Sequence, residues 1–167
     1  RVRLDEIDKY PPFSGRESDP VSLAKERTRT WRGRRTHYLT STPTTRSGPI
    51  WKAWEGCGDR RKYFIPCPKC GTWQALVWPN VRWPKIDKTK TESADQIEMQ
   101  KLAYYECNIC QFHIEDHHKP KMLDAGIWLS ENQTITGSAN VIGERPETKR
   151  VGNHLNSLYS PWWDFSG

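Results

Sequence analysis

Four of the five cysteines occur as two pairs with a two-residue gap, and this spacing constrains the fold more than any other feature of the chain. One pair is Cys67 and Cys70, and the other is Cys107 and Cys110. A two-residue gap lets both thiolates of one tight turn reach the same tetrahedral ion at about 2.3 Å. Two such turns fill the coordination sphere, and soft thiolates favour Zn²⁺ over harder ions. The sequence therefore predicts one structural Zn²⁺ bound by all four cysteines.

Two other uses of paired cysteines are weighed against zinc. Disulfides are disfavoured because the sequence shows no secretory signal, and a redox dithiol would leave the second pair without a role. Gly71 follows the first pair, at a position where such a turn often needs a positive φ. His113, His117 and His118 follow the second pair and could substitute as ligands, but nothing in the sequence requires them, and solvated histidines are the favoured interpretation. Cys57 lies outside both pairs and is interpreted as a reduced thiol.

The composition argues against a large dry core and for a charged surface. Hydrophobic residues make up 35% of the 167-residue chain, and the mean hydropathy is −0.88. No apolar run approaches the roughly 18 residues of a membrane span, so we expect a soluble intracellular protein without a membrane partner. The net charge of +6 fits either a solvated basic surface or a polyanionic partner. Basic residues concentrate at Arg27, Arg29, Arg32, Arg34 and Arg35, and again at Arg60, Arg61 and Lys62.

Short elements are expected along the chain, with polar segments between them. A strand should hold Val2 and Leu4, and a helix capped by Asp19 or Ser22 should run to about Arg32. The remaining expected elements are a strand at 36–42, a helix at 50–55, strands on either side of the first cysteine pair, a surface loop at 84–91, a helix from Ser93 to Ala103 with a capping box to Gln96, a short helix that ends before Gly126, and a loop or linker at 130–150.

The first strand ends in two acidic residues, Asp5 and Glu6. This is the Walker B pattern of P-loop ATPases, in which the aspartate holds Mg²⁺ and the glutamate polarises the attacking water. Acidic strand ends are common in other proteins, so the motif by itself is weak. A second strand ends in Ser41, Thr42, Pro43 and Thr44, whose small hydroxyl side chains suit a γ-phosphate sensor that couples hydrolysis to motion, or an ordinary turn.

Taken in order, these elements resemble the large subunit of tailed-phage terminase, in its lambda-like GpA branch. The similar stretches are residues 5–11, 41–44, 59–71, 105–110, 126–128 and 154–162. Gln111 stands where the family usually has glycine, and Asn153 replaces an aromatic residue before His154. The chain contains no G-x-x-x-x-G-K-[ST] phosphate-binding loop and lacks the acidic cluster of the family's nuclease. We therefore expect residues 1–167 alone to be inactive as ATPase and as endonuclease.

The resemblance implies an α/β fold in which a partial parallel sheet of a P-loop ATPase precedes a small β-rich zinc-ribbon module. The implied domains are 1–62, the C-terminal half of the ATPase core, 63–128, the zinc ribbon, and 129–167, a linker and the start of the nuclease. The implied activity is cutting and ATP-driven translocation of viral DNA, with Asp5 binding Mg-ATP, Glu6 catalytic and residues 41–44 coupling. The implied cofactors are structural Zn²⁺, Mg²⁺ and ATP.

The implied partners are double-stranded DNA, the terminase small subunit, the portal protein of the procapsid and further copies of the chain. The implied location is the bacterial host cytoplasm, transiently at the portal. Arg60 and Arg61 are candidates for DNA contact or for a trans-acting arginine finger. Two alternatives stay open from the sequence: a non-enzymatic zinc-ribbon module that binds DNA or protein, and an inactive prophage remnant.

Overall fold

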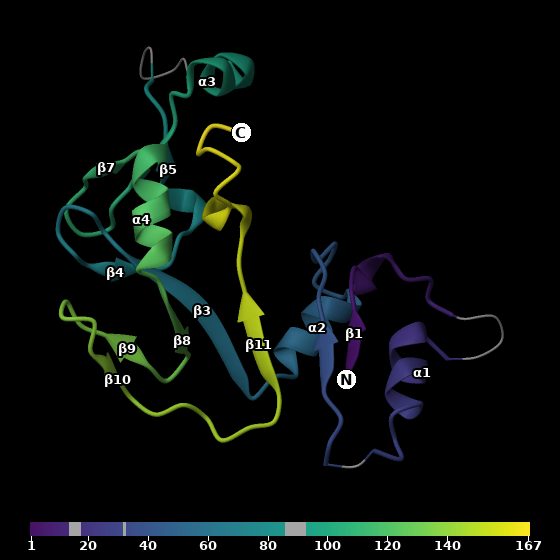
Figure 1. The fold of residues 1–167 in the computed structure, drawn as a ribbon. Coiled ribbons are helices and arrows are strands. Elements are labelled where there is room, and N and C mark those ends of the chain that lie inside the picture. The colour runs from purple at the N-terminus through teal and green to yellow at the C-terminus, as the bar shows by residue number, and fades with distance from the viewer. Residues whose placement is uncertain (14–17, 32, 86–92) are drawn as a thin grey trace. The chain divides into compact units, whose positions relative to one another are not determined.

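The computed structural model describes residues 1–13, 18–31, 33–85 and 93–167. The chain divides into two compact units, Arg1–Cys57 (unit 1) and Gly58–Gly167 (unit 2) (Figure 1). The expected boundary after residue 62 falls inside strand β3 (Asp59–Pro66). The expected segment 129–167 is not separate from the cysteine-containing part, because its strand β11 (Val151–His154) pairs with β3. No helix among the described residues has the length and apolar character needed to cross a membrane.

Unit 1 is built around a short parallel pair of strands, β1 (Val2–Leu4) and β2 (His37–Leu39). The pairing brings Leu4 opposite Leu39, so both strands end at the same edge. A 3₁₀ turn after β1 buries Ile7, which is 1% exposed. The helices of this unit are α1 (Pro20–Glu26) and α2 (Pro49–Glu55), and the 3₁₀ turn η1 spans Ile7–Lys9.

Helix α1 begins where the sequence predicts but ends earlier. The Asp19 carboxylate accepts hydrogen bonds of 3.0 Å from the backbone nitrogens of Val21 and Ser22, so Asp19 is the N-cap. The helix ends at Glu26 and continues only as turns, whereas a helix to about Arg32 was expected. Arg32 lies outside the described residues, as does most of the expected loop at 84–91.

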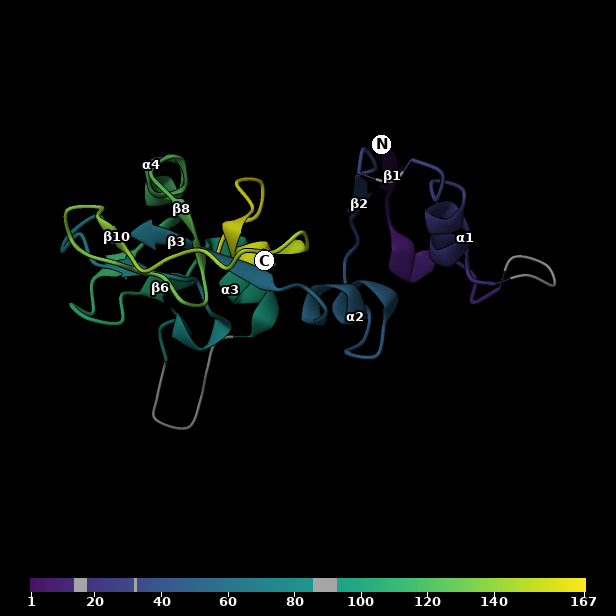
Figure 2. The same cartoon turned by 90° about the horizontal axis from the view of Figure 1, so that it is seen from below.

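Unit 2 contains two sheets of more than two strands among its described residues (Figure 1, Figure 2). In the first, β3 pairs in parallel with β11 and antiparallel with both β4 and β8. In the second, β6 pairs antiparallel with β5 and β7. The bounds of these strands are β4 (Trp73–Gln74), β5 (Val81–Arg82), β6 (Tyr104–Glu106), β7 (His113–Ile114) and β8 (Ile127–Ser130).

Shorter elements complete unit 2. Helix α3 (Ala94–Gln100) carries the predicted capping box between Ser93 and Gln96, but ends before the expected Ala103. The segment expected to be a loop at 130–150 contains a two-strand hairpin of β9 (Thr134–Ile135) and β10 (Val141–Ile142). The others are η2 (Trp78–Asn80), η3 (Asp116–His118), α4 (Lys119–Asp124) and η4 (Ser157–Tyr159).

The core of unit 2 joins both sheets to the C-terminal segment, residues 157–166. Tyr105 and Ile114 are fully buried there, together with Leu158 and Phe165 from the C-terminal segment. Tyr159 connects the parts, because its hydroxyl accepts from Leu76 N at 2.7 Å and donates to Tyr63 O at 2.6 Å. The C-terminal segment is therefore part of the packed interior of unit 2.

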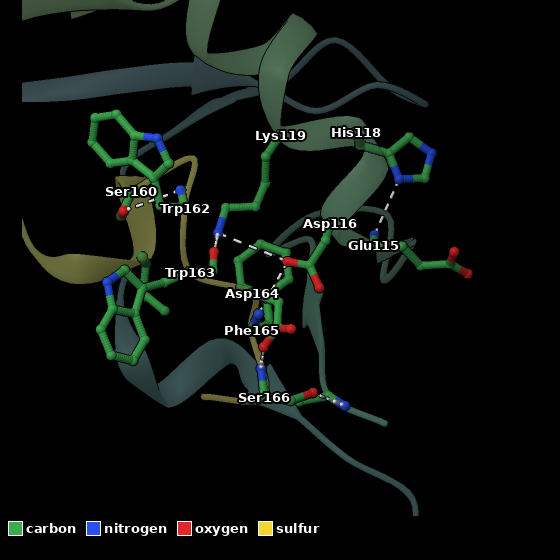
Figure 3. A network of polar contacts seen from close by, with 12 residues as sticks. Glu115, Asp116, His118, Lys119, Ser160, Trp162, Trp163, Asp164, Phe165 and Ser166 are labelled. Atoms are coloured by element: carbon green, nitrogen blue, oxygen red, sulfur yellow. Dashed lines mark hydrogen bonds and ion pairs between the residues drawn. The ribbon is translucent and has the colours of Figure 1, made fainter. Parts of the chain in front are cut away.

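A buried lysine holds this segment in place (Figure 3). Lys119 is 4% exposed, and its Nζ donates to Trp163 O at 2.6 Å. The same ammonium lies 3.7 Å from Asp116 Oδ1 and 4.5 Å from the centre of the Phe165 ring. Asp116 Oδ1 also accepts from Phe165 N at 3.0 Å. Burial lowers the pKa of Lys119, while Asp116 and Asp164 act in the opposite direction.

Candidate metal centre and acidic strand end

The two cysteine pairs lie in two turns with the same backbone hydrogen bonds. In the first turn, Cys67 N donates to Thr72 O at 2.9 Å and Gly71 N donates to Cys67 O at 2.9 Å. In the second, Cys107 N donates to Phe112 O at 3.0 Å and Gln111 N donates to Cys107 O at 3.1 Å. Each turn closes an antiparallel hairpin, β3 with β4 and β6 with β7. The chain therefore builds the same cysteine-bearing turn twice.

Both turns place a left-handed residue after their second cysteine. Gly71 has φ of 69°, as the sequence suggests for a glycine at this position. Gln111 has φ of 56° at the equivalent position. A side chain with Cβ is strained in this region of backbone conformation. The second turn thus has the same hydrogen bonds as the first although it has glutamine in place of glycine.

The structure brings all four predicted sulfurs together. They lie within 4.8 Å of one another, and the separations Cys67 Sγ to Cys110 Sγ and Cys70 Sγ to Cys107 Sγ are both 3.8 Å. A disulfide needs a separation of about 2.05 Å, so none is formed. A tetrahedral ion with bonds of about 2.3 Å to sulfur would separate its ligands by roughly 3.8 Å. The four cysteines can therefore bind a metal such as zinc.

The sulfurs differ in their surroundings. Cys67 and Cys107 are buried in the core of unit 2, whereas Cys70 is exposed. Burial raises the pKa of the Cys67 thiol to about 12, and burial also raises the pKa of Cys110. Hydrogen bonding with Thr72, whose hydroxyl lies 3.3 Å away, lowers the pKa of Cys70 to about 6. Buried thiols bind a metal only as thiolates, so metal binding here must release protons.

The neighbouring histidines make contacts of other kinds. His113 stacks on Tyr104 with a centroid separation of 3.9 Å, and His117 Nδ1 lies 3.3 Å from Glu115 Oε2. His118 Nδ1 accepts from Glu115 N at 3.1 Å (Figure 3). Within the described part of the chain, the only group of three or more convergent His, Cys, Asp or Glu ligand atoms is the four cysteines.

The acidic strand end lies next to the second strand end in unit 1. Asp5 and Glu6 directly follow β1 and are exposed, and Glu6 takes a left-handed conformation with φ of 52°. Thr40, directly after β2, donates from its hydroxyl to Asp5 Oδ1 at 2.5 Å. Glu6 N donates to the same oxygen at 3.0 Å. The parallel register of β1 and β2 therefore holds Asp5 against the segment that leads into residues 41–44.

Asp8 links the two segments more extensively, and sequence reasoning gave it no role. Its Oδ2 accepts from Thr44 N at 2.9 Å and from the Thr44 hydroxyl at 3.0 Å, and its backbone nitrogen donates to Ser41 Oγ at 3.1 Å. Its Oδ1 accepts from Ile50 N at 2.8 Å. Burial raises the pKa of Asp8, but these hydrogen bonds outweigh it, so the pKa is lower than the usual 3.8.

One sequence signal could have pointed to Asp8. The N-cap residue of helix α2 is Gly48, which has no side chain to cap the helix, so the free N–H groups of the first turn need an acceptor from elsewhere. A Cβ on Gly48 would collide with the Asp8 carboxylate. The absence of a side chain at Gly48 therefore leaves room for the Asp8 carboxylate, which accepts a hydrogen bond from the first turn of α2.

The two candidate arginines are both paired inside unit 2. Arg61 forms a bidentate pair with Asp59, with contacts of 2.6 and 2.7 Å, and the Asp59 side chain is 1% exposed. Burial raises the pKa of Asp59, but the guanidinium of Arg61 helps to bring it below its usual value. Arg60 lies 2.7 Å from Glu131. The structure therefore places Arg61 as the counter-ion of a buried carboxylate.

A family model described as phage terminase large subunit gpA, ATPase domain, matches residues 1–128. The chain belongs to this family. The match includes the acidic strand end, residues 41–44 and both cysteine pairs of this gpA-type chain, whereas residues 129–167 lie outside it. No curated protein and no solved structure matches the sequence.

Proposed function

We propose that this chain is part of a viral DNA-packaging motor, a terminase large subunit that couples ATP hydrolysis to cutting and translocation of double-stranded DNA into the procapsid. The observation that carries the proposal is the parallel pairing of β1 with β2, which holds Asp5 beside the start of residues 41–44. In parallel α/β sheets, ligands bind at the carboxyl ends of the strands. Membership of the terminase ATPase family supports the assignment of that edge to ATP.

The proposed roles follow from the chemistry of each side chain. Asp5 would help to hold Mg²⁺ and the bound ATP, since a carboxylate is a preferred ligand of this hard cation. Glu6 would orient the water that attacks the γ-phosphate. When bound, Mg-ATP supplies the phosphoryl chemistry, and these carboxylates position it. Residues 41–44 would couple hydrolysis to movement, and the hydrogen bonds between Asp8 and Thr44 support that role because they join the two strand ends.

The four cysteines would bind one structural Zn²⁺ in a zinc-ribbon module. The repeated turn and the 3.8 Å sulfur separations support this role. The four soft donors leave no open position for catalysis. The proposed partners are those of the family, namely duplex DNA, the small subunit, the portal and further copies of the chain, in the cytoplasm of a bacterial host.

The nucleotide role is tested in a terminase assembly that supplies the phosphate-binding loop. We expect Glu6→Gln to abolish ATP hydrolysis while ATP binding persists, and Asp5→Ala to weaken Mg-dependent ATP binding. Glu26→Gln is the matched control, because Glu26 is an exposed carboxylate of the same unit that pairs only with Arg29 among the described residues. Unchanged hydrolysis in the Glu6→Gln protein would favour the alternative, a zinc-ribbon binding module that is indifferent to ATP.

A further inference from the structure

The positive charge of the chain is unevenly divided between the two units. Unit 1 carries twelve lysines and arginines against seven acidic residues, a net charge of +5. Unit 2 carries fourteen against thirteen, a net charge of +1. A concentration of basic charge on one unit is the electrostatic footprint of a polyanionic partner. Most of the net positive charge therefore comes from the first 57 residues.

Within unit 1, the basic charge gathers in the connection between α1 and β2. Arg27, Arg29, Arg34 and Arg35 are all exposed there. Arg29 pairs with Glu26 at 3.3 Å, whereas the other three make no ion pair with any acidic residue in the described ranges. These unpaired guanidinium groups are available to an external anion.

Two aromatic residues lie in or next to this connection. Trp31 lies within it and is 63% exposed, so its ring is available for contact with a partner. His37, at the start of β2, has a lowered pKa, first because of burial and then because of the charges of Arg35 and Lys25. The local potential is therefore positive on the side where the connection enters the strand.

The second basic cluster differs from the first. Arg61 is held by the buried Asp59, and Arg60 lies against Glu131. If Arg61 left Asp59 to bind another anion, the Asp59 carboxylate would remain buried without a counter-ion, which is energetically costly. Among the described arginines of the two clusters, Arg27, Arg34 and Arg35 are thus the ones without an acidic partner.

We propose that the unpaired, exposed arginines of the connection between α1 and β2, namely Arg27, Arg34 and Arg35, bind the phosphate backbone of double-stranded DNA. This inference rests on the proposed function, because it assigns the DNA-contacting surface of the same motor. Contacts to phosphates carry no sequence information, which suits a machine that moves arbitrary sequence. Each arginine that neutralises a phosphate releases a counterion, so binding depends steeply on salt concentration.

The test measures binding of the 167-residue chain to a fluorescent duplex of arbitrary sequence over a series of salt concentrations. The variant is Arg34→Gln with Arg35→Gln. The control is Lys9→Gln with Lys52→Gln, which removes the same charge from exposed positions elsewhere in unit 1. We expect the arginine variant to lose about two units of salt slope, roughly one for each phosphate contact removed, and the control to retain the slope.

Three outcomes would overturn the inference. Equal losses in the two double variants would show that net charge alone attracts the DNA. Tighter binding of a single strand than of the duplex, dependent on Trp31, would assign the surface to exposed bases. Loss of ATP turnover in a complete terminase, with unchanged DNA binding, would make one of these arginines a trans-acting finger. Circular dichroism and hydrogen exchange within unit 1 identify any variant that is misfolded.

Failure here is distinguishable from failure of the proposed function. The Glu6→Gln experiment reports on ATP hydrolysis and requires no DNA, whereas the salt series requires no ATP. A chain that passes the first and fails the second is a motor whose DNA surface lies elsewhere. A chain that fails the first and passes the second is a DNA-binding module without the proposed nucleotide role.

Discussion

The two cysteine turns allow a reciprocal experiment, since one has glycine where the other has glutamine. Gly71 and Gln111 both follow the second cysteine of a pair, with φ of 69° and 56°. We predict that Gly71→Ala weakens the metal centre and that Gln111→Gly strengthens it. The two changes exchange backbone strain between equivalent positions, so they should have opposite signs.

The expected magnitude follows from the backbone. A residue with Cβ in the left-handed region costs about 1–2 kcal/mol. Glycine avoids this strain, but its greater conformational freedom in the unfolded chain lowers the stability of the folded state by about 0.4–1 kcal/mol. A Cβ at Gly71 would meet nothing within 4 Å, so only the backbone term applies there. The net change should be roughly 0.5–1 kcal/mol in each direction.

Zinc affinity is measured by competition with a chromophoric chelator, and stability is measured by thermal unfolding of the zinc-bound protein. Because metal binding and folding of such a module are coupled, about 0.5–1 kcal/mol becomes a change of roughly two- to fivefold in apparent affinity. Thr72→Ser is a suitable control for Gly71→Ala, since it alters the same turn and retains the hydroxyl near Cys70.

A shift of the same sign in both variants would contradict an effect of backbone strain. If Gln111→Gly lowered zinc affinity, the glutamine side chain would be making a contribution larger than the backbone strain. If Gly71→Ala had no effect, the left-handed conformation would not be required for the turn to hold both sulfurs. Either finding would show that the left-handed backbone conformation of the turn does not determine the stability of the metal centre.

Other expected outcomes concern the metal, its pH dependence, Asp8 and Lys119. Freshly reduced protein should contain about one zinc per chain by elemental analysis, and chelation or Cys67→Ser should unfold the region 63–128; metal-free protein with unchanged stability would contradict this. Zinc affinity should fall as pH falls, because burial raises the pKa of Cys67 to about 12 and protons compete with the metal for the sulfur. Equal zinc affinities at pH 6 and pH 8 in the chelator competition would contradict this prediction. Asp8→Asn should destabilise unit 1 at neutral pH, as measured by faster hydrogen exchange. Because the native pKa of Asp8 is below 3.8, the carboxylate stabilises the fold above that value, and this stabilisation is lost as pH falls through the lowered pKa. A difference between the two proteins that persisted in strong acid would contradict this prediction. Lys119→Met should free the backbone at Trp163 and speed proteolysis of the C-terminal segment, and unchanged cleavage would show that Lys119 is dispensable.

The features that the sequence predicted well are local or strongly typed. Cysteine spacing identifies a shared centre without knowledge of the fold, because few arrangements other than a common ion use two such pairs. Asp19 and the capping box at Ser93 were predictable because a helix start depends on the next three residues. The placement of Asp5 beside the second strand end follows once two consecutive strands are taken as parallel.

The features that it missed depend on partners far along the chain. Strand β11 contains Gly152 and Asn153, which are poor strand formers, and it exists because β3 offers an open edge more than 85 residues earlier. Asp8 acquires its role only when residues 41–50 fold back onto it. The hairpin of β9 with β10 is different, because its two strands pair across a short local turn in a polar segment without hydrophobic periodicity.

The pairing of β3 with β11 has a mechanical consequence. Unit 1 joins β3 at its N-terminal end, and the C-terminal segment leaves β11 at its C-terminal end, while the two strands run in parallel over Asp59–Lys62 and Val151–His154. Tension between unit 1 and the C-terminal segment therefore pulls these strands past each other along their length. Once the contacts of the C-terminal segment give way, the hydrogen bonds between β3 and β11 share the load instead of opening one at a time. The sheet beside the cysteine centre is thus arranged to bear a stretching force.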